Sequence, residues 1–188
     1  MLLAPACAGV RREGPESDVA LYRARVRLRD GDGRAFRLLL FAALPDRLHA
    51  EALGPTGAPH LVVDGGGGRL AVAFPGEGVA FEGEAAPEAM ARVLGIPVTL
   101  PDLVGFLKEG RDPGVPGLTL RRSPAGSGLP REAELASGPA TLGLARRQWR
   151  PSAPHPETLG TGRAAPGLEV RPLAELPDLG LPAIGKDP

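Results

Sequence analysis

The 188-residue chain has a single cysteine, few aromatic residues and no excess of either charge. One thiol excludes an internal disulfide framework and a metal site built from several thiolates. Lysine and arginine balance aspartate and glutamate at 22 each, so the formal net charge is zero. This balance argues against a broadly basic surface and therefore against nucleic acid as a partner. No apolar run approaches the roughly 20 residues that a membrane-spanning helix needs.

Glycine and proline are abundant, at 27 and 22 residues, and their excess lies toward the C-terminus. A chain of this length suits one domain, with or without a tail. We predict a single domain over residues 20–150, preceded by a signal-like end and linker at 1–19. Residues 151–188 are Pro-rich, and we expect one final strand at 168–173 followed by a flexible tail.

The first residues, MLLAPACAG, form a short apolar stretch that passes directly into charged sequence. The stretch resembles the end of a bacterial lipoprotein signal peptide, where a small residue precedes a cysteine that becomes lipidated. It has no charged leader and is shorter than an apolar core of about 7–15 residues. Two interpretations stay open: the true start lies upstream and Cys7 is lipidated, or Cys7 is an ordinary residue. We predict lipidation at Cys7.

Within residues 20–29, an apolar residue alternates strictly with arginine from Tyr22 onward, which is typical of a half-buried strand. The DGDG sequence at 30–33 predicts a hairpin. The strand that follows has apolar side chains on both faces. An odd-numbered loop would place Arg37 on the arginine face and Leu38 on the face of Tyr22, and we favour this register.

In the rest of the domain, the spacing of apolar residues changes from that of strands to that of helices and back. Short apolar runs between Gly- and Pro-containing turns predict further strands at 46–53, 58–64, 69–74 and 79–83. Two helices are expected at 86–95 and 99–110, the second because Thr99 and Asp102 have capping-box spacing. Strands then resume at 117–123, 131–137 and 140–149.

This order of elements resembles the LolA/LolB-like family of bacterial lipoprotein carriers and their outer-membrane relatives. Three stretches of sequence within about residues 20–150 carry the resemblance: LPDRLHAEALGPTGAP, VAFPGEGVAFEGEA and VLGIPVTLPDLVGFLKEG. The resemblance implies an α+β, mostly β fold, in which a strongly curved antiparallel sheet forms an incomplete barrel covered by two short helices. In this family the space between sheet and helices holds acyl chains.

Carried onto this chain, the resemblance implies a lipid-binding cavity on the inward face of the sheet. Its lining would be Tyr22, Val26, Leu28, Phe36, Leu38, Leu40, Leu48, Leu61, Val63, Leu70, Val72, Phe74 and Phe81. A helical lid would contribute Met90, Leu94, Leu103, Phe106 and Leu107. One long acyl chain would gain on the order of 10 kcal/mol there before ordering costs. The same residues equally suit a filled core, and the sequence leaves that alternative open.

We therefore predict a non-catalytic lipoprotein of the bacterial cell envelope, in the outer membrane and facing the periplasm. Its expected partners are lipid or lipoprotein acyl chains, the outer membrane through a lipid anchor, and another envelope protein. Its expected role is the localisation of lipoproteins to the outer membrane, with no cofactor and no nucleic acid. The alternative is an envelope scaffold or interaction module of the same fold, with a filled core and no ligand.

Two charged patterns need a separate interpretation. If Leu53 pairs with Ala58, then His49, Glu51 and His60 share one face of a hairpin, but that face is solvated, so we expect no metal. The arginines at 23–29 are interpreted as the exposed face of a strand, with anionic headgroups or an acidic partner as the alternative.

The chain departs from the family pattern in two places. LolB-type proteins carry a protruding loop with an apolar tip, whereas the turn at 54–57 here is short and has no such tip. The segment after Trp149 has no counterpart that we can map.

Overall fold

The computed structural model describes residues 19–27, 35–54, 56–123, 131–138, 140–147 and 160–177. The strands are β1 (Val19–Arg27), β2 (Ala35–Ala43), β3 (Arg47–Leu53), β4 (Pro59–Gly66), β5 (Arg69–Phe74), β6 (Val79–Glu84), β7 (Leu118–Ser123), β8 (Glu132–Ser137), β9 (Ala140–Arg147) and β10 (Glu169–Pro172). The helices are α1 (Pro87–Leu94) and α2 (Leu100–Glu109), with short 3-10 turns at Pro75–Glu77 and Leu173–Glu175. Cys7, Leu28 and the predicted tail after residue 177 lie outside the described residues.

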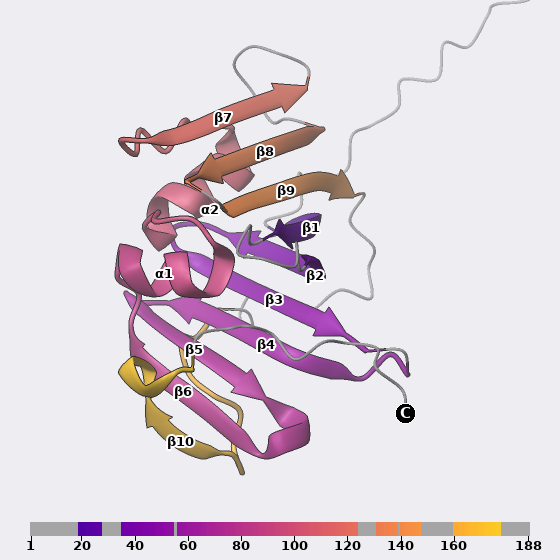
Figure 1. Ribbon diagram of the computed structural model, residues 1–188, viewed down its shortest axis with the longest axis vertical. Coiled ribbons are helices and arrows are strands. Elements are labelled where there is room, and N and C mark those ends of the chain that lie inside the picture. The colour runs from indigo at the N-terminus through magenta and orange to yellow at the C-terminus, as the bar shows by residue number, and fades with distance from the viewer. Residues whose placement is uncertain are drawn as a thin grey trace, which may run out of the picture.

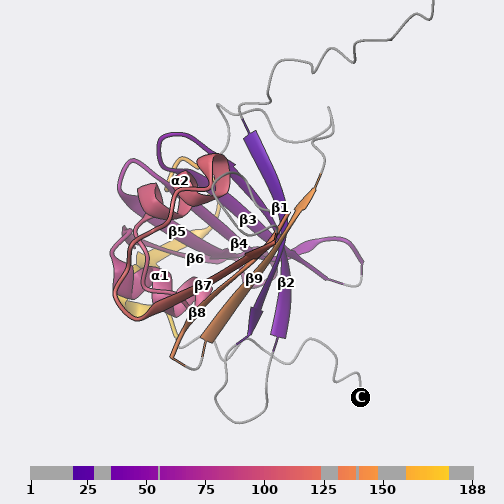
Figure 2. The ribbon, with the colours of Figure 1, turned by 90° about the horizontal axis from the view of Figure 1, so that it is seen from above.

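All ten strands belong to one sheet in the order β10-β6-β5-β4-β3-β2-β1-β9-β8-β7. Neighbours are antiparallel except β10, which runs parallel to β6. The sheet is strongly curved, and α1 and α2 both lie on its concave side (Figures 1 and 2). β10 and β7 remain as edges, so the sheet does not close into a barrel. This architecture confirms the predicted fold class.

The register between β1 and β2 confirms the favoured loop parity. Arg25 pairs with Arg37, and Tyr22 pairs with Leu40. Tyr22 and Leu40 are both fully buried under the helices, whereas both arginines are exposed. The hairpin therefore places its apolar side chains inside and its arginines outside, as the period-two pattern requires.

The apolar residues on both faces of β2 serve two different clusters. Leu38 and Leu40 belong to the main core beneath the helices. Phe41 points to the outer face, where it is 6% exposed and packs with Ala43 and with the half-buried Leu39. β2 thus has apolar side chains on both faces because its inner face joins the main core and its outer face carries a small cluster of its own.

The ends of α2 follow the predicted capping pattern. The Thr99 hydroxyl accepts a hydrogen bond from the Asp102 amide at 3.3 Å and donates one to the Asp102 carboxylate at 2.6 Å. Gly110 ends the helix with φ of 71°, a left-handed conformation that glycine adopts without strain. Within the described part of the chain, no helix is long and apolar enough to span a membrane.

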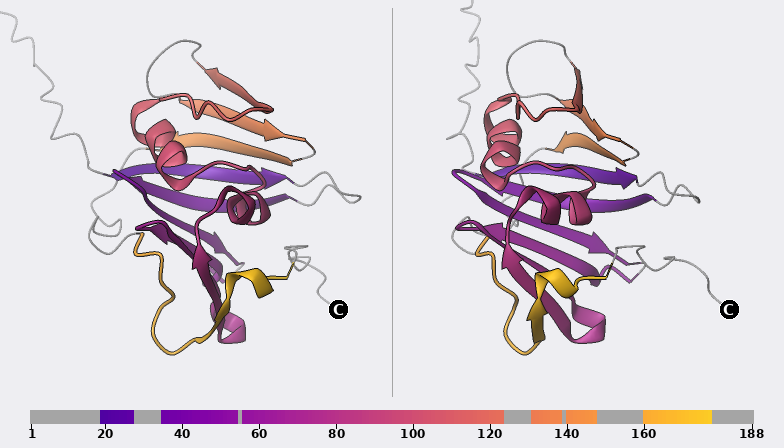
Figure 3. Two further views of the ribbon diagram at one scale, coloured as in Figure 1. Left: turned by 90° about the vertical axis from the view of Figure 1, so that its left-hand side faces the viewer. Right: turned by 60° about the vertical axis from the view of Figure 1, so that its left-hand side comes forward.

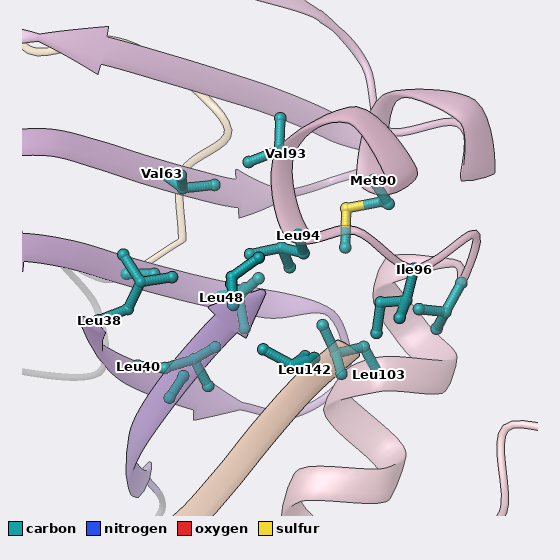
Figure 4. Close-up of a cluster of buried hydrophobic side chains, with 14 of the residues drawn as sticks. Leu38, Leu40, Leu48, Val63, Met90, Val93, Leu94, Ile96, Leu103 and Leu142 are labelled. Carbon is teal, nitrogen blue, oxygen red and sulfur yellow. The ribbon is translucent and has the colours of Figure 1, made fainter. Parts of the chain in front are cut away.

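One glycine fixes how closely α2 approaches the sheet. A side chain on Gly65 of β4 would come within 2.8 Å of the Leu100 side chain at the start of the helix. The bare backbone at this point lets Leu100 pack directly on the sheet, and Leu100 is 1% exposed. Figure 4 shows side chains of both helices pointing toward those of β2 and β3.

The C-terminal segment, residues 160–177, crosses from one face of the sheet to the other (Figure 3). It starts against the outer side of β4, where the carbonyl of Gly160 would lie 1.8 Å from a side chain on Gly66. It then pairs with β6 as β10, which corresponds to the strand predicted at 168–173. Finally, Leu173 and Leu176 enter the main core on the inner side. This segment is therefore part of the same folded unit as the sheet.

Candidate functional site

The predicted cavity-lining residues lie together on the inner face of the sheet. Every one with a described side chain is at most 8% exposed and belongs to one buried cluster. Leu28 lies outside the described residues, and so does the side chain of Phe36. The backbone of Phe36 pairs with Val26, which places it at an inner-face position of β2.

The predicted lid residues cover this face and fill the space above it. Their side chains are each 0% exposed, and they are Met90, Leu94, Leu103, Phe106 and Leu107. Figure 4 shows Met90 and Leu94 of α1 and Leu103 of α2 close to Leu48 and Leu142 of the sheet. The structure thus shows an apolar face that the helices cover completely, and acyl-chain binding on it stays a prediction.

Sequence reasoning missed part of this cluster. Among the fully buried residues that it did not single out are Ile96, Val98, Leu135 and Leu142. β8 and β9 alternate as amphipathic strands, but their pattern could not show that β9 returns beside β1. The inner face is therefore wider than the predicted set.

No charged side chain of the inner face is in the buried class, as far as the structure describes it. Among the described residues, Asp64 is the only polar or charged residue in the buried class, and it points to the outer face. The buried Tyr22 hydroxyl donates a hydrogen bond to the Leu107 carbonyl at 2.8 Å. Burial raises the Tyr22 pKa, so this hydroxyl stays protonated and acts as a link between β1 and α2.

A few polar contacts fasten the ends of the helices. Arg122 of β7 donates a hydrogen bond to the Gly110 carbonyl at 3.0 Å, and its guanidinium lies 5.9 Å from the centre of the Phe106 ring. Arg92 of α1 donates to the Leu173 and Leu176 carbonyls, each at 3.4 Å. α2 is therefore tied to the sheet, whereas α1 is tied to the C-terminal segment.

A second polar cluster lies on the opposite, outer face. His49 of β3 is held between two carboxylates: Nδ1 is 2.9 Å from Asp64 Oδ2, and Nε2 is 3.0 Å from Glu51 Oε1. Burial alone would lower the His49 pKa, but the hydrogen bonds and charges of Asp64 and Glu51 outweigh it and raise the pKa to about 9. His49 is accordingly an imidazolium near neutral pH.

Asp64 also fastens the C-terminal segment. It accepts hydrogen bonds from the Gly162 amide at 2.9 Å, the Thr161 hydroxyl at 3.0 Å and the Gly160 amide at 3.3 Å. Burial would raise its pKa, but the hydrogen bond with His49 and those from residues 161–162 lower it overall. Both ring nitrogens of His49 and both carboxylate oxygens of Asp64 thus have partners, so the cluster holds the C-terminal segment on the sheet. A cavity of about 340 Å³ lies beside the cluster.

The polar cluster at this hairpin does not consist of the residues that the sequence predicted, which were His49, Glu51 and His60. The predicted pairing of Leu53 with Ala58 is wrong, because Leu53 pairs with Pro59 and the register shifts between Ala52 and Leu53. His49 consequently lies opposite Asp64, a residue that sequence reasoning did not single out. Among the residues that the structure describes, no group of histidine, cysteine or carboxylate side chains is arranged to hold a metal ion.

No protein-family model matches the chain, and no curated protein matches it. The resemblance to LolA/LolB-like proteins accordingly rests on the order of elements and the local sequence, and membership of that family stays a prediction.

Proposed function

We propose that this chain is a non-catalytic protein of the bacterial cell envelope that binds lipid or lipoprotein acyl chains on the inner face of its sheet. The observation that carries the proposal is a continuous apolar face, covered by two helices of only 8 and 10 residues. A role in placing lipoproteins in the outer membrane, through a lipid anchor at Cys7, belongs to the same proposal.

An acyl chain reaches this face only if the helices move away, and the free energies of that exchange are nearly balanced. Each large buried side chain of the helices stabilises the covered state by about 2 kcal/mol, so the three of α1 and the five of α2 together contribute about 16 kcal/mol. An acyl chain of about 16 carbons gains about 12 kcal/mol from the same burial. An acyl chain can therefore replace the lid side chains at a net change of only a few kcal/mol.

The helices are also suited to such displacement. Isolated helices shorter than about 12 residues are marginal in water, so α1 and α2 depend on contact with the sheet. The polar ties at Tyr22, Arg92 and Arg122 are individually worth about 1 kcal/mol. Loss of these ties together with the apolar contact would free both helices.

The alternative is an interaction module of the same fold that binds no lipid. The complete burial of the inner face favours it, because residues such as Leu40 and Val63 are 0% exposed and already have protein neighbours. In that case the helices are a permanent part of the core, and partners bind elsewhere.

Titration with saturated fatty acids of increasing length separates the two. The full chain with Cys7→Ser, freed of co-purified lipid, is mixed with a fluorescent fatty acid, which is then displaced by chains of about 10 to 16 carbons. If the inner face binds them, affinity rises about fourfold per CH₂. A dicarboxylic acid of equal length is the control, because its second charge would be buried and its binding should be much weaker. A folded protein that shows neither saturation nor length dependence supports the interaction module.

A further inference from the structure

Five arginines gather on the outer face of three neighbouring strands, and we call them the arginine patch. Its members are exposed and are Arg23, Arg25, Arg27, Arg37 and Arg147. They come from β1, β2 and β9, which lie next to one another in the middle of the sheet. The patch stands out because the chain as a whole carries no net charge.

The charge of the patch is not balanced within the described structure. Arg25 lies directly opposite Arg37, an arrangement of like charges that destabilises a strand pair. None of the five guanidinium groups makes an ion pair or hydrogen bond with another described residue. Among the residues that the structure describes, these cations have no counter-ion, and we take this as a sign of an external anionic partner.

A groove of about 600 Å³ runs beside the patch. Its floor includes the small residues Gly143 and Ala145 of β9, and Arg23 and Arg25 form one wall. The opposite wall carries Glu132 and Glu134 of β8, and Arg121 of β7 lies beside Glu134.

The arginines of the first wall do not meet the glutamates of the second. In register, Gly143 separates Arg25 from Glu134, and Ala145 separates Arg23 from Glu132. Two strand spacings, about 9.5 Å, lie between the walls. The groove can thus bind a ligand whose anionic group contacts the arginines. The rest of the same ligand can extend toward the glutamate carboxylates or into water.

Apolar residues continue the same face beyond the arginines. Leu39 lies opposite Arg23, and Leu21 opposite Phe41. Leu21 and Leu39 are half-buried and pack against Phe41 and Ala43. A basic patch next to partly exposed aliphatic side chains is typical of a surface that rests on a bilayer.

We propose that the arginine patch docks the protein on a membrane surface that contains anionic phospholipid. The headgroup phosphates lie against Arg23, Arg25 and Arg37, whose planar guanidinium groups match phosphate oxygens in pairs. Because the patch lies on the side of the sheet away from the helices, docking leaves the helices that cover the inner face pointing away from the membrane (Figure 2). Docking does not depend on acyl-chain binding or on a lipid anchor.

Vesicle flotation tests this directly. The full chain with Cys7→Ser is mixed with vesicles of phosphatidylcholine, alone or with about 30% phosphatidylglycerol, at about 0.1 M salt. We expect binding only to the anionic vesicles. In the same background, Arg23→Gln/Arg25→Gln/Arg37→Gln should reduce the partition coefficient roughly 100-fold.

The matched control removes the same charge elsewhere, at the exposed Arg111, Arg163 and Arg171, and should change binding by less than about threefold because these residues lie outside the patch. Equal binding to neutral vesicles, equal losses in both triple variants, or full displacement by millimolar inorganic phosphate would each overturn membrane docking. Absence of wild-type binding would overturn it as well.

The fatty-acid titration keeps this inference separate from the proposed function. The patch variant should bind fatty acid like the parent protein, because its substitutions lie on the outer face. A parent protein that binds vesicles but no fatty acid would support docking and refute acyl-chain binding. The reverse result would refute docking alone.

Discussion

Raising the pH above neutral should loosen the C-terminal segment from the sheet, because it removes the charge of His49. The His49 pKa rises from 6.5 to about 9 in the folded protein. The stability that this shift contributes is fully present below pH 6.5 and is lost as pH rises through about 9. The neutral ring no longer compensates Asp64, which accepts the hydrogen bonds of Gly160, Thr161 and Gly162.

The magnitude follows from the size of the shift. A pKa change from 6.5 to about 9 corresponds to about 3 kcal/mol of unfolding free energy. The Glu51 side chain is 30% exposed, so water screens part of its interaction with His49. We therefore expect the free energy of unfolding to fall by about 2 kcal/mol between pH 6.5 and 9.5.

Urea unfolding followed by far-UV circular dichroism at a series of pH values measures this loss. His49→Gln is the control, because glutamine keeps hydrogen-bonding capacity but does not titrate. The variant should be less stable than the parent at pH 6.5, and the gap should narrow by about 2 kcal/mol at pH 9.5. Parallel stability curves for the two proteins across this range would show that His49 is not held charged by its carboxylates, and would refute the reasoning.

Two further predictions concern the attachments of the C-terminal segment and of α2. Gly66→Ala should destabilise the protein by about 2 kcal/mol, because the new methyl group would meet the Gly160 carbonyl. Gly76→Ala is the control: its methyl group would meet nothing within 4 Å, so the urea midpoint should stay nearly unchanged. Tyr22→Phe leaves the Leu107 carbonyl without its donor and should cost about 1 to 2 kcal/mol in urea unfolding, while it speeds fatty-acid uptake in stopped-flow fluorescence. Uptake at the parental rate would show that this hydrogen bond does not hold the helices over the inner face.

The fold was largely predictable because its signals are local. Alternation of Arg25 with Val26 marks a strand without reference to the rest of the chain. Thr99 and Gly110 likewise mark the two ends of α2 through capping chemistry that acts within a few residues. Such features depend on neighbours in sequence, and one sequence is enough to read them.

The features that escaped prediction depend on contacts distant in sequence. Asp64 shows no special pattern in β4, and its role appears only because Gly162, 98 residues further on, donates a hydrogen bond to it. The turn after Leu53 looked like a four-residue hairpin, but a register shift moved its pairing to Pro59. A single-residue shift of this kind leaves no mark in the apolar pattern when the strand ends in Gly and Pro.

The inner face shows a different limit. The sequence correctly placed Leu40 and Val63 on one apolar surface, but an apolar surface covered by helices and one covered by lipid require the same residues. Only the difference in free energy between the two coverings decides the matter, and no pattern in a single sequence reports that difference.

The two faces of the sheet are physically connected through the C-terminal segment. On the outer side Asp64 holds its first residues, and on the inner side Arg92 of α1 donates to the carbonyls of Leu173 and Leu176. Loss of the outer fastening would leave α1 with fewer fixed partners, because the carbonyls that Arg92 binds would move with the segment. The segment therefore couples the charge state of His49 to the stability of the helical cover, and helix release should become easier under the alkaline conditions that neutralise this histidine.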